Sequence, residues 1–152
     1  MKIRKAKIDD YENIINLYKQ LHDEETKYDE NIIDNYIVDK KQAKIIKDKI
    51  KSKKEIFLIA EVDKKIVGLI DGYIFDSIYY KDKISILEHI CVDKEYRNKK
   101  IATSLINEFS EKSKKKGAKY IRLFVFENND KATNLYKKLG FTDYIVYYNK
   151  KI

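Results

Sequence analysis

The sequence predicts a single α/β domain in which a mixed sheet carries helices on both faces. The chain has 152 residues, enough for one domain with a proper core. Strand-like and helix-like hydrophobic patterns follow one another in the order β-α-α-β-β-β-α-β-α-β. A run of hairpin strands followed by a β-α-β unit requires antiparallel and parallel neighbours in one sheet. We therefore expect residues 1–152 to form one domain, without a repeat or a linker.

The first third predicts one strand and two helices. Residues 2–8 alternate enough to form a strand, and Asp9 and Asp10 can cap the helix that follows. That helix has apolar residues at helical spacing, namely Tyr11, Ile14, Ile15, Tyr18 and Leu21. The acidic stretch after His22 is expected to be a loop or a broken helix. A second helix in the lysine-rich segment is marked by Ala43, Ile46 and Ile50.

The middle of the chain predicts a hairpin and a third strand. Residues 55–62 and 66–75 are the expected hairpin strands, joined by a tight connection at residues 63–65. Gly68 and Gly72 are expected to weaken or kink the second of these strands. Residues 84–92 form the next expected strand.

The last third predicts two helices and two strands. Residues 101–109 carry an apolar stripe, and the helix that they begin stops at Gly117. Residues 120–126 form a nearly continuous apolar run, typical of a strand buried on both faces. Asp130 can cap a final helix that ends at Gly140. Residues 142–148 are the expected last strand.

Charge narrows the classes of partner. The net charge of +8 and the pI of about 9.2 favour an anionic partner, such as nucleic acid, acidic lipid or a phosphorylated cofactor, or else mark a solvated lysine surface. Residues 22–34 hold six acids and one Lys, net −5, whereas residues 40–54 hold eight Lys and one Asp, net +7. This segregation separates a cation-binding edge from an anion-binding edge, or simply gives two solvated helix faces. No aromatic–basic motif or recognition helix supports nucleic-acid binding.

Other sequence features concern the compartment. No apolar run approaches the roughly 20 residues that span a bilayer, and the N-terminus lacks the apolar core of a secretory signal. The single cysteine, Cys91, cannot form an internal disulfide, which fits a reducing compartment. A cytoplasmic protein without a membrane partner is expected.

Two segments of the second half predict a cofactor site. In residues 84–106 an apolar strand leads into a short basic loop that opens an amphipathic helix, an arrangement that offers backbone N–H groups to phosphate oxygens. In residues 128–141 a short helix adds an Asn and a Tyr. Together they indicate a long phosphorylated cofactor with a phenol near its reactive end.

These segments resemble the GNAT superfamily of acyl-CoA-dependent N-acetyltransferases over essentially the whole chain. The family's loop pattern Arg/Gln-x-x-Gly-x-Gly/Ala corresponds to residues 97–102 (RNKKIA), and residues 92–96 resemble its V-D-P-x-Y lead-in. The later pattern N-x-x-A-x-x-L-Y-x-x-x-G-F is matched in full by residues 129–141. The resemblance implies a mostly antiparallel sheet of six to seven strands with about four helices, and acetyl-CoA as co-substrate.

The resemblance also implies which residues contact acetyl-CoA. They are Ile90, Cys91, Val92, Arg97, Asn98, Lys99, Lys100, Ile101, Ala102, Thr103, Asn129, Ala132 and Tyr136. Lys100 stands where the family usually has Gly, so it either takes an ordinary helical conformation or crowds the pyrophosphate. Asn129 is implied to hold the pantetheine arm, and its alternative role is that of a helix cap.

The implied reaction is direct attack of an amine on the thioester. Glu88 is the expected proton acceptor, because a similar L-E-x-I-x-V pattern occurs in the spermidine/spermine acetyltransferase branch. It interrupts an apolar row of the strand, which favours a role or a partner, and a salt-bridged Glu is the alternative. His89 is expected on the opposite face as a hydrogen-bonded structural residue. No metal site is expected, since His89-x-Cys91 lacks further ligands.

Two further groups complete the implied chemistry. A backbone N–H of Cys91 or of its neighbours is expected to stabilise the negative charge on the thioester oxygen. Tyr136 is expected to protonate the leaving thiolate, with a core tyrosine as the alternative. Cys91 itself is expected to be a buried hydrophobe and not a nucleophile.

The acceptor is the least defined part of the expectation. Asp23, Glu24 and Glu25, with Glu88, are expected to attract a polyamine-like small molecule. A protein N-terminus or lysine is the alternative acceptor, and a non-catalytic acyl-CoA-binding regulatory domain is the alternative from another class. The apolar last strand also suggests a homodimer.

Overall fold

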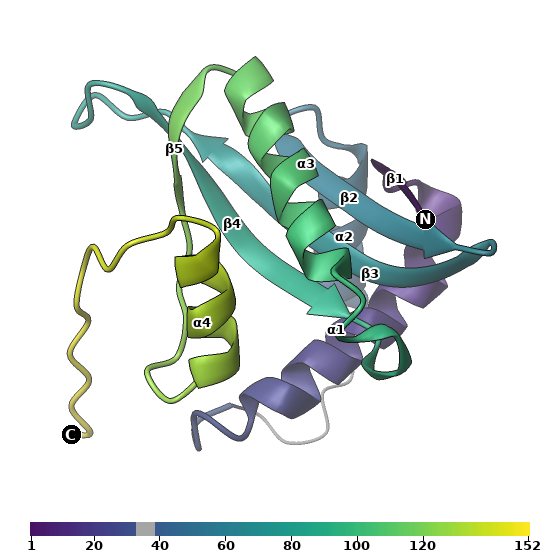
Figure 1. Cartoon of the computed structure of the whole chain (residues 1–152), viewed down its shortest axis with the longest axis horizontal. Coiled ribbons are helices and arrows are strands. Elements are labelled where there is room, and N and C mark those ends of the chain that lie inside the picture. The colour runs from purple at the N-terminus through teal and green to yellow at the C-terminus, as the bar shows by residue number, and fades with distance from the viewer. Residues whose placement is uncertain (33–38) are drawn as a thin grey trace.

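The computed structural model describes residues 1–32 and 39–152, and its centre is a five-stranded sheet in the order β1-β2-β3-β4-β5 (Figure 1). The strands are β1 (Lys2–Lys5), β2 (Glu55–Val62), β3 (Lys65–Phe75), β4 (Lys83–Val92) and β5 (Ala118–Arg122). Neighbours are antiparallel from β1 to β4, whereas β4 and β5 are parallel. The predicted mixed sheet is confirmed, but five strands replace the expected six to seven.

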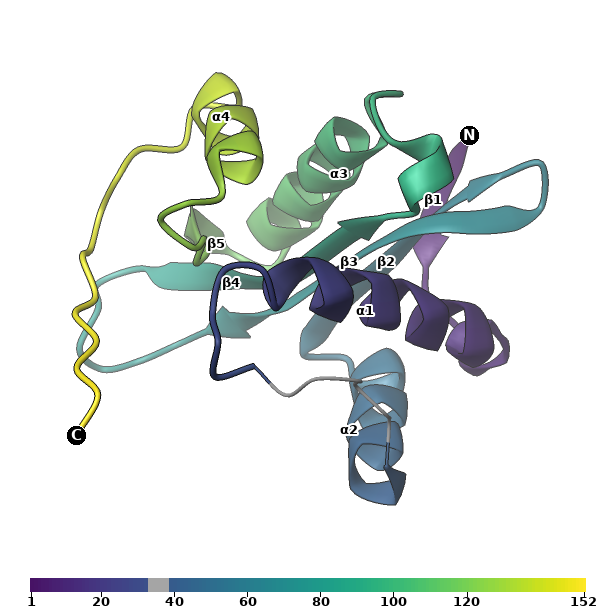
Figure 2. The same cartoon turned by 90° about the horizontal axis from the view of Figure 1, so that it is seen from below.

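Helices cover both faces of the sheet, as predicted. α1 (Tyr11–Glu25) and α2 (Lys40–Lys51) lie on one face, and α3 (Ile101–Lys115) and α4 (Asp130–Lys138) lie on the other (Figure 2). Single 3₁₀ turns, η1 (Ile8–Asp10) and η2 (Lys94–Tyr96), precede α1 and follow β4. No helix in the described part of the chain has the length and hydropathy needed to cross a membrane.

The sheet separates two hydrophobic cores. The core under α1 and α2 includes Ile14, Leu17, Ile46, Phe57 and Leu69. The core under α3 and α4 includes Val67, Ile70, Leu105, Phe109 and Tyr136. Residues of β2 and β3 contribute to both cores because successive side chains of a strand point to opposite faces.

The start of α1 differs from the expectation. The first strand ends at Lys5, because residues 8–10 form η1. The Asp10 carboxylate does not cap α1; it accepts hydrogen bonds from Arg4 at 2.7 and 2.8 Å and from the Lys7 N–H at 2.7 Å. The helix itself continues to Glu25, so the acidic residues just after His22 are helical and do not form a loop.

A β-bulge interrupts the pairing of β3 with β4. Asp71 pairs with His89 and Gly72 pairs with Leu87, so Glu88 is an extra residue on β4. Gly72 permits this close approach, because a Cβ atom there would lie 2.0 Å from the Ile86 carbonyl oxygen. The irregularity near Gly72 is thus a bulge whose extra residue lies on β4, while β3 itself runs unbroken from Lys65 to Phe75.

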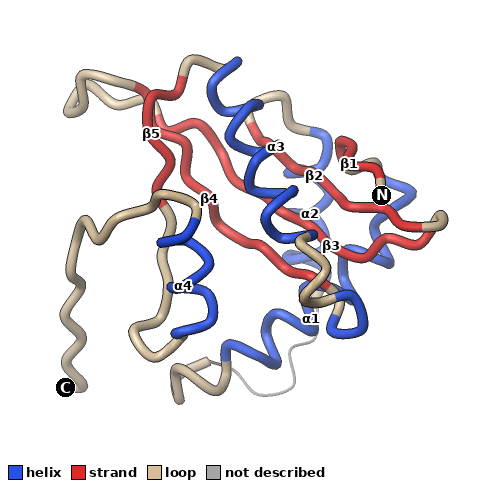
Figure 3. The backbone as a smooth tube through the Cα atoms, viewed as in Figure 1, coloured by secondary structure: helices blue, strands red, loops and turns tan. Residues whose placement is uncertain are grey.

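The C-terminal part departs most from the expectation. β5 ends at Arg122, and residues 142–148 do not form a strand (Figure 3). The prediction that residues 120–126 are buried on both faces is wrong, because Tyr120 and Phe124 are 59% and 67% exposed. The cap of α4 is Asn129, whose side chain accepts from the Ala132 N–H at 3.1 Å, and not Asp130.

Candidate active site

The open edge of β4 is the first component of the site. Pairing with β5 stops at Ile86 and Arg122, whereas β4 continues to Val92, and the two strands part in Figure 1. The Asp93 N–H donates to the Val67 oxygen at 2.9 Å on the β3 side. Since N–H groups alternate along a strand, the Cys91 N–H also faces β3, and those of Ile90 and Val92 face the open edge.

The N-terminus of α3 is the second component. The first hydrogen bond of its ladder runs from the Ser104 N–H to the Lys100 oxygen at 3.0 Å. The N–H groups of Ile101, Ala102 and Thr103 therefore have no partner within the helix. Such groups, with the helix dipole, favour an anion at this end.

Lys100 takes a left-handed conformation with φ of 60°, which excludes the ordinary helical conformation, one of the two alternatives given for this residue. Asn98 in the same loop has φ of 64°, which asparagine tolerates better than lysine does. The backbone at residue 100 thus has the geometry that glycine favours. The backbone of the loop is therefore strained at Lys100.

Lys100→Gly is expected to relieve this strain. A left-handed lysine costs about 1–2 kcal/mol, partly offset by the larger entropy that glycine loses on folding, so a net gain of about 0.5–1 kcal/mol is expected. Urea unfolding measures it. Lys99→Gly is the matched control, because Lys99 lacks positive φ and should lose stability. Equal losses in both variants would contradict the assignment of strain to residue 100.

Arg97 fastens the loop to its surroundings. Its Nε donates to the Val92 oxygen at 3.2 Å, and its Nη1 lies 3.3 Å from the Glu24 carboxylate on α1. The Lys99 ammonium lies 4.7 Å from the centre of the Tyr96 ring. The predicted cofactor residue Arg97 therefore joins β4, α1 and the loop.

Tyr136 of α4 lies in the core beneath α3 and α4 and is 8% exposed. Burial, followed by the negative charge of Glu25, raises the pKa of its phenol to about 12. The phenol is thus protonated at neutral pH, as a general acid must be. The pKa of Tyr136 on α4 thus depends on the charge of Glu25 at the end of α1.

A polar cluster with a buried centre at Asp71 lies on the α1 and α2 face of the bulge. We define it as Tyr18, Lys49, Asp71, Glu88 and His89. The fully buried Asp71 carboxylate accepts from the Tyr18 hydroxyl at 2.8 Å and from the Lys49 ammonium at 3.1 Å. Its other oxygen lies 2.8 Å from His89 Nδ1, and Lys49 also forms a short ion pair with Glu88.

The charges in this polar cluster support one another. Burial alone would raise the pKa of Asp71, but His89, Lys49 and Tyr18 outweigh it and hold the pKa below its usual value. Burial alone would lower the pKa of His89, but the hydrogen bond and charge of Asp71 raise it. The pKa of Lys49 is raised in the same way by Asp71 and Glu88, against the effect of burial.

The bulge corrects the expected faces of β4. Glu88 and His89 were expected on opposite faces, yet ligand atoms of Asp71, Glu88 and His89 all lie within 4.8 Å of one another. The extra residue shifts the alternation, so both side chains point toward α1 and α2. The same spacing would suit a metal ion, but the Lys49 ammonium is ion-paired with both carboxylates.

Sequence reasoning missed Tyr18, Lys49 and Asp71 as members of the site. Asp71 offered a signal, because an acid interrupts the apolar strand IVGLIDGYIF just as Glu88 interrupts β4. Lys49 offered none, since it is one of many lysines in its segment.

The three acidic residues at the end of α1 lie in different environments. Glu24 pairs with Lys27 and Arg97, which lower its pKa against the effect of burial. Burial raises the pKa of Glu25, with His89 and His22 opposing that rise. Asp23 is exposed. Residues 33 and 34, the end of the expected acidic segment, lie outside the described residues.

Cys91 is buried beneath α1, and burial raises the pKa of its thiol to about 12. The thiolate is therefore scarce at neutral pH, which agrees with the expected hydrophobic role.

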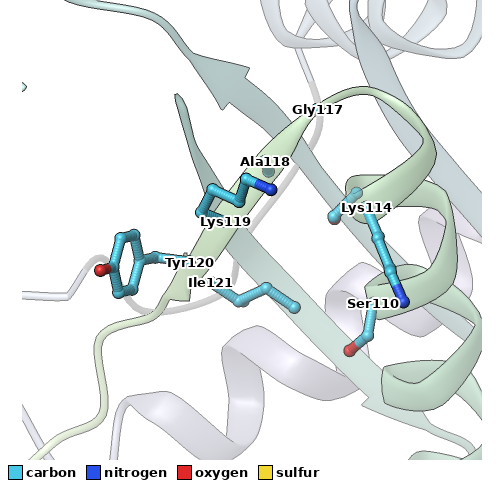
Figure 4. Close-up of a pocket in the computed structure, with 8 residues that line it drawn as sticks. Ser110, Lys114, Gly117, Ala118, Lys119, Tyr120 and Ile121 are labelled. Atoms are coloured by element: carbon cyan, nitrogen blue, oxygen red, sulfur yellow. The ribbon is translucent and has the colours of Figure 1, made fainter. Parts of the chain in front are cut away.

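A pocket of about 260 Å³ lies away from these groups, between the C-terminal half of α3 and β5 (Figure 4). Its lining includes Ser110, Lys114, Gly117 and Ile121. Ile121 points toward α3 in this view, whereas Tyr120 points to the other side.

Comparison with known proteins adds a family and a fold. The sequence profile described as "Acetyltransferase (GNAT) family" matches residues 11–141. An uncharacterised N-acetyltransferase of Methanocaldococcus jannaschii is 31% identical over 144 residues, which cover 93% of this chain and 60% of the relative. This chain thus spans about three fifths of the length of that relative.

Two solved structures share the fold. A tetramutant of the BH1408 protein from Bacillus halodurans has a TM-score of 0.89 at 19% identity, with 100% of both chains covered. The aminoglycoside N-acetyltransferase AAC(6')-Iy in complex with CoA has a TM-score of 0.71 at 21% identity, with 99% of this chain and 100% of that chain covered.

Proposed function

Because the chain belongs to the GNAT family of acetyltransferases, we propose that it transfers the acetyl group of acetyl-CoA to a primary amine by direct attack. The observation that carries this proposal is the Lys49 ammonium, which lies between the carboxylates of Asp71 and Glu88. A primary ammonium therefore fits this cluster, and Glu88 belongs to β4, the strand with the open edge. An acceptor amine would bind the same carboxylates.

The proposed binding of acetyl-CoA rests on two features, the loop before α3 and the open edge of β4. The N–H groups of residues 101–103 would bind the pyrophosphate of acetyl-CoA, with Arg97, Asn98, Lys99 and Lys100 shaping the loop around it. The N–H groups of Ile90 and Val92 would face the pantetheine arm and the thioester oxygen. Asn129 and Ala132, joined by the α4 cap, would border the arm on its other side.

The proton steps complete the reaction. The bound ammonium first loses one proton to Glu88, directly or through water, and Glu88 passes it to solvent. The neutral nitrogen then bonds to the thioester carbon, the C–S bond breaks, and the nitrogen gives up a second proton by the same route. Tyr136 gives its proton to the leaving thiolate, so the products are an amide and free CoA. Glu88 then releases its proton to solvent, and Tyr136 takes one back from solvent.

A small polycationic amine is the acceptor that the charges favour. Glu25, with Asp23 and Glu24 beside it on α1, provides further negative charge near the polar cluster, since Glu25 influences both His89 and Tyr136. Solved proteins of the same fold include an aminoglycoside acetyltransferase bound to sisomicin. A protein lysine is the second candidate, because the group bound between Asp71 and Glu88 is itself a lysine ammonium.

A thiol-release assay tests this function. Acetyl-CoA would be offered with polyamines, aminoglycosides, amino acids and basic peptides, and turnover is expected with the polycationic small molecules. Acetyl-CoA alone should also raise the melting temperature at concentrations above its Kd. A chain that binds acetyl-CoA without turnover of any amine would instead be a non-catalytic acyl-CoA-binding domain. If acetyl-CoA does not raise the melting temperature at all, the proposal that it is the acetyl donor is wrong.

Glu88→Gln is expected to lower kcat by about 10²-fold and to change the shape of its pH profile, because the amine proton then depends on solvent. His89→Gln is the matched comparison on the same bulge and should keep the profile. An imidazole acceptor would work only above its raised pKa, and Asp71→Asn would then move the rising limb to lower pH. That shift, with an unchanged profile for Glu88→Gln, would assign the proton to His89.

A further inference from the structure

Lys49 differs from the other lysines of α2 in where its side chain lies. Ile46, Lys49 and Ile50 share the face of the helix that packs toward the sheet, because residues three and four apart lie on one side of a helix. The Lys49 side chain is 20% exposed. The remaining lysines of the helix are all exposed, namely Lys40, Lys41, Lys44, Lys47 and Lys51. Ordering a long charged side chain in a partly buried place costs entropy and hydration, so the groups that Lys49 meets there have to offset this cost.

The groups that surround the Lys49 ammonium are those of the proposed acceptor site. Its nitrogen lies 3.1 Å from Asp71 Oδ2 on β3 and forms the short ion pair with Glu88 on β4. A lysine side chain ends in a primary alkylammonium, which is the same chemical group as the acceptor in the proposed function. An arrangement that brings the thioester carbon to an acceptor nitrogen at this place would therefore also bring it to Lys49.

We propose that Lys49 is itself an acetyl acceptor, so that the domain transfers an acetyl group from acetyl-CoA to its own Lys49 Nζ. This inference rests on the proposed function, because it uses the same donor, the same base and the same acid. It goes beyond that function because the nucleophile is a residue of the chain and the product is a modified protein. A nucleophile that is fixed beside the reacting centre has an advantage, since no second molecule has to be bound and oriented.

The transfer to Lys49 uses the groups already described, and its protons balance. The Lys49 ammonium gives one proton to Glu88, directly or through water, and Glu88 passes it to solvent. The neutral Nζ bonds to the thioester carbon, the C–S bond breaks, and Nζ gives up a second proton by the same route. Tyr136 protonates the leaving thiolate and takes a proton back from solvent. The products are an acetyl-lysine at residue 49 and one free CoA, and the positive charge of the lysine is lost.

The intrinsic reactivity of Lys49 distinguishes this transfer from background chemistry. Burial would lower the pKa of Lys49, but Asp71 and Glu88 outweigh it and raise the pKa above its usual value. A smaller fraction of this amine is therefore neutral than for a lysine with the ordinary pKa. Spontaneous acetylation by acetyl-CoA in solution would thus favour exposed lysines. Preferential acetylation of Lys49 requires a bound donor and a base beside the nitrogen.

Mass spectrometry of the full chain, incubated with acetyl-CoA and without any added amine, tests the proposal. The intact protein is expected to gain one acetyl group, and peptide mapping should place this group on Lys49. At early times Lys49 should be acetylated at least about 10-fold faster than Lys44 or Lys47, which are exposed on the same helix. The rate per molecule should not depend on protein concentration, because the acceptor belongs to the chain that binds the donor.

Three variants make the assignment specific. Lys49→Arg keeps a cation beside the carboxylates, but arginine stays protonated, so the acetyl group on residue 49 and the release of one CoA should both disappear. Lys44→Arg removes an exposed lysine of the same helix and should leave the acetylation of Lys49 unchanged. Glu88→Gln should slow the acetylation of Lys49 by about 10²-fold, because the proton acceptor is lost.

The possible failures can be told apart. Acetylation spread evenly over the exposed lysines would overturn the proposal and indicate background chemistry. If added amines are acetylated while Lys49 stays unmodified, this inference is wrong and the proposed function stands. If acetyl-CoA neither stabilises the chain nor modifies any amine, the proposed function fails and the inference fails with it.

Discussion

Tyr136→Phe is expected to slow acetyl transfer by about 10²-fold or more and to leave acetyl-CoA binding nearly intact. The change removes only the hydroxyl, and the ring keeps its place in the core and its edge contact with Phe141. With a pKa of about 12, the phenol holds its proton through the neutral and moderately alkaline range. The loss in kcat should therefore be nearly constant from pH 7 to pH 9.

Steady-state thiol release gives kcat, and calorimetric titration with CoA gives the Kd of the product cofactor. Tyr79→Phe is the control, because Tyr79 is 85% exposed and lies outside the site. An unchanged kcat for Tyr136→Phe would leave Tyr136 as a packing residue and require another acid. A large fall in CoA affinity with equal kcat would point to binding instead of proton transfer.

Gly72→Ala is expected to destabilise the fold by about 3 kcal/mol or more. The new Cβ would lie 2.0 Å from the Ile86 oxygen and 2.9 Å from Phe109 Cζ, so the backbone of two strands has to shift. The shift falls at the bulge and would displace Glu88 and His89 from Asp71. Activity per folded molecule should therefore fall together with stability.

Urea unfolding measures the first effect, and kcat at a temperature where the variant is folded measures the second. Gly68→Ala is the matched control on the same strand, because its Cβ would lie 3.1 Å from the Cys91 oxygen and 3.2 Å from Leu105 Cδ1. About 1 kcal/mol is expected there. Similar losses for the two variants would show that the bulge tolerates a side chain at residue 72.

The central strands could be predicted because their signals are local. β2 runs over its predicted residues, and β3 and β4 differ by one residue at their starts. The tight connection between β2 and β3 is also confirmed, with positive φ at Asp63 and Lys64. The bulge could not be predicted, because it depends on the register between two strands and on the space opposite Gly72.

The predicted C-terminal strand is a case in which a local pattern was misleading. Residues 142–148 have a strand pattern, but a strand needs a partner with which to share backbone hydrogen bonds. The open edge of β5 and this segment do not pair within one chain, so the local pattern overstates the number of strands.

The polar cluster was accessible only through the folded structure. Lys49 and Asp71 are far apart in the sequence, and they meet because α2 packs against β2, the neighbour of β3 in the sheet. Lysine composition alone favoured a solvated face for this segment. The motif at residues 129–141, in contrast, is short and continuous, so its helix and the place of Tyr136 within it could be read directly.

Under the proposed function, Lys49 would also set a threshold for selectivity among amines. An acceptor that binds Asp71 and Glu88 has to displace an ammonium that is tethered to the same molecule, and a tether of this kind acts as a millimolar or higher effective concentration of competitor. A simple monoamine at micromolar concentration would lose this competition. An acceptor with a second cationic group near Glu25 gains an interaction that Lys49 cannot match, so the protein's own side chain would act as a filter against common cellular amines.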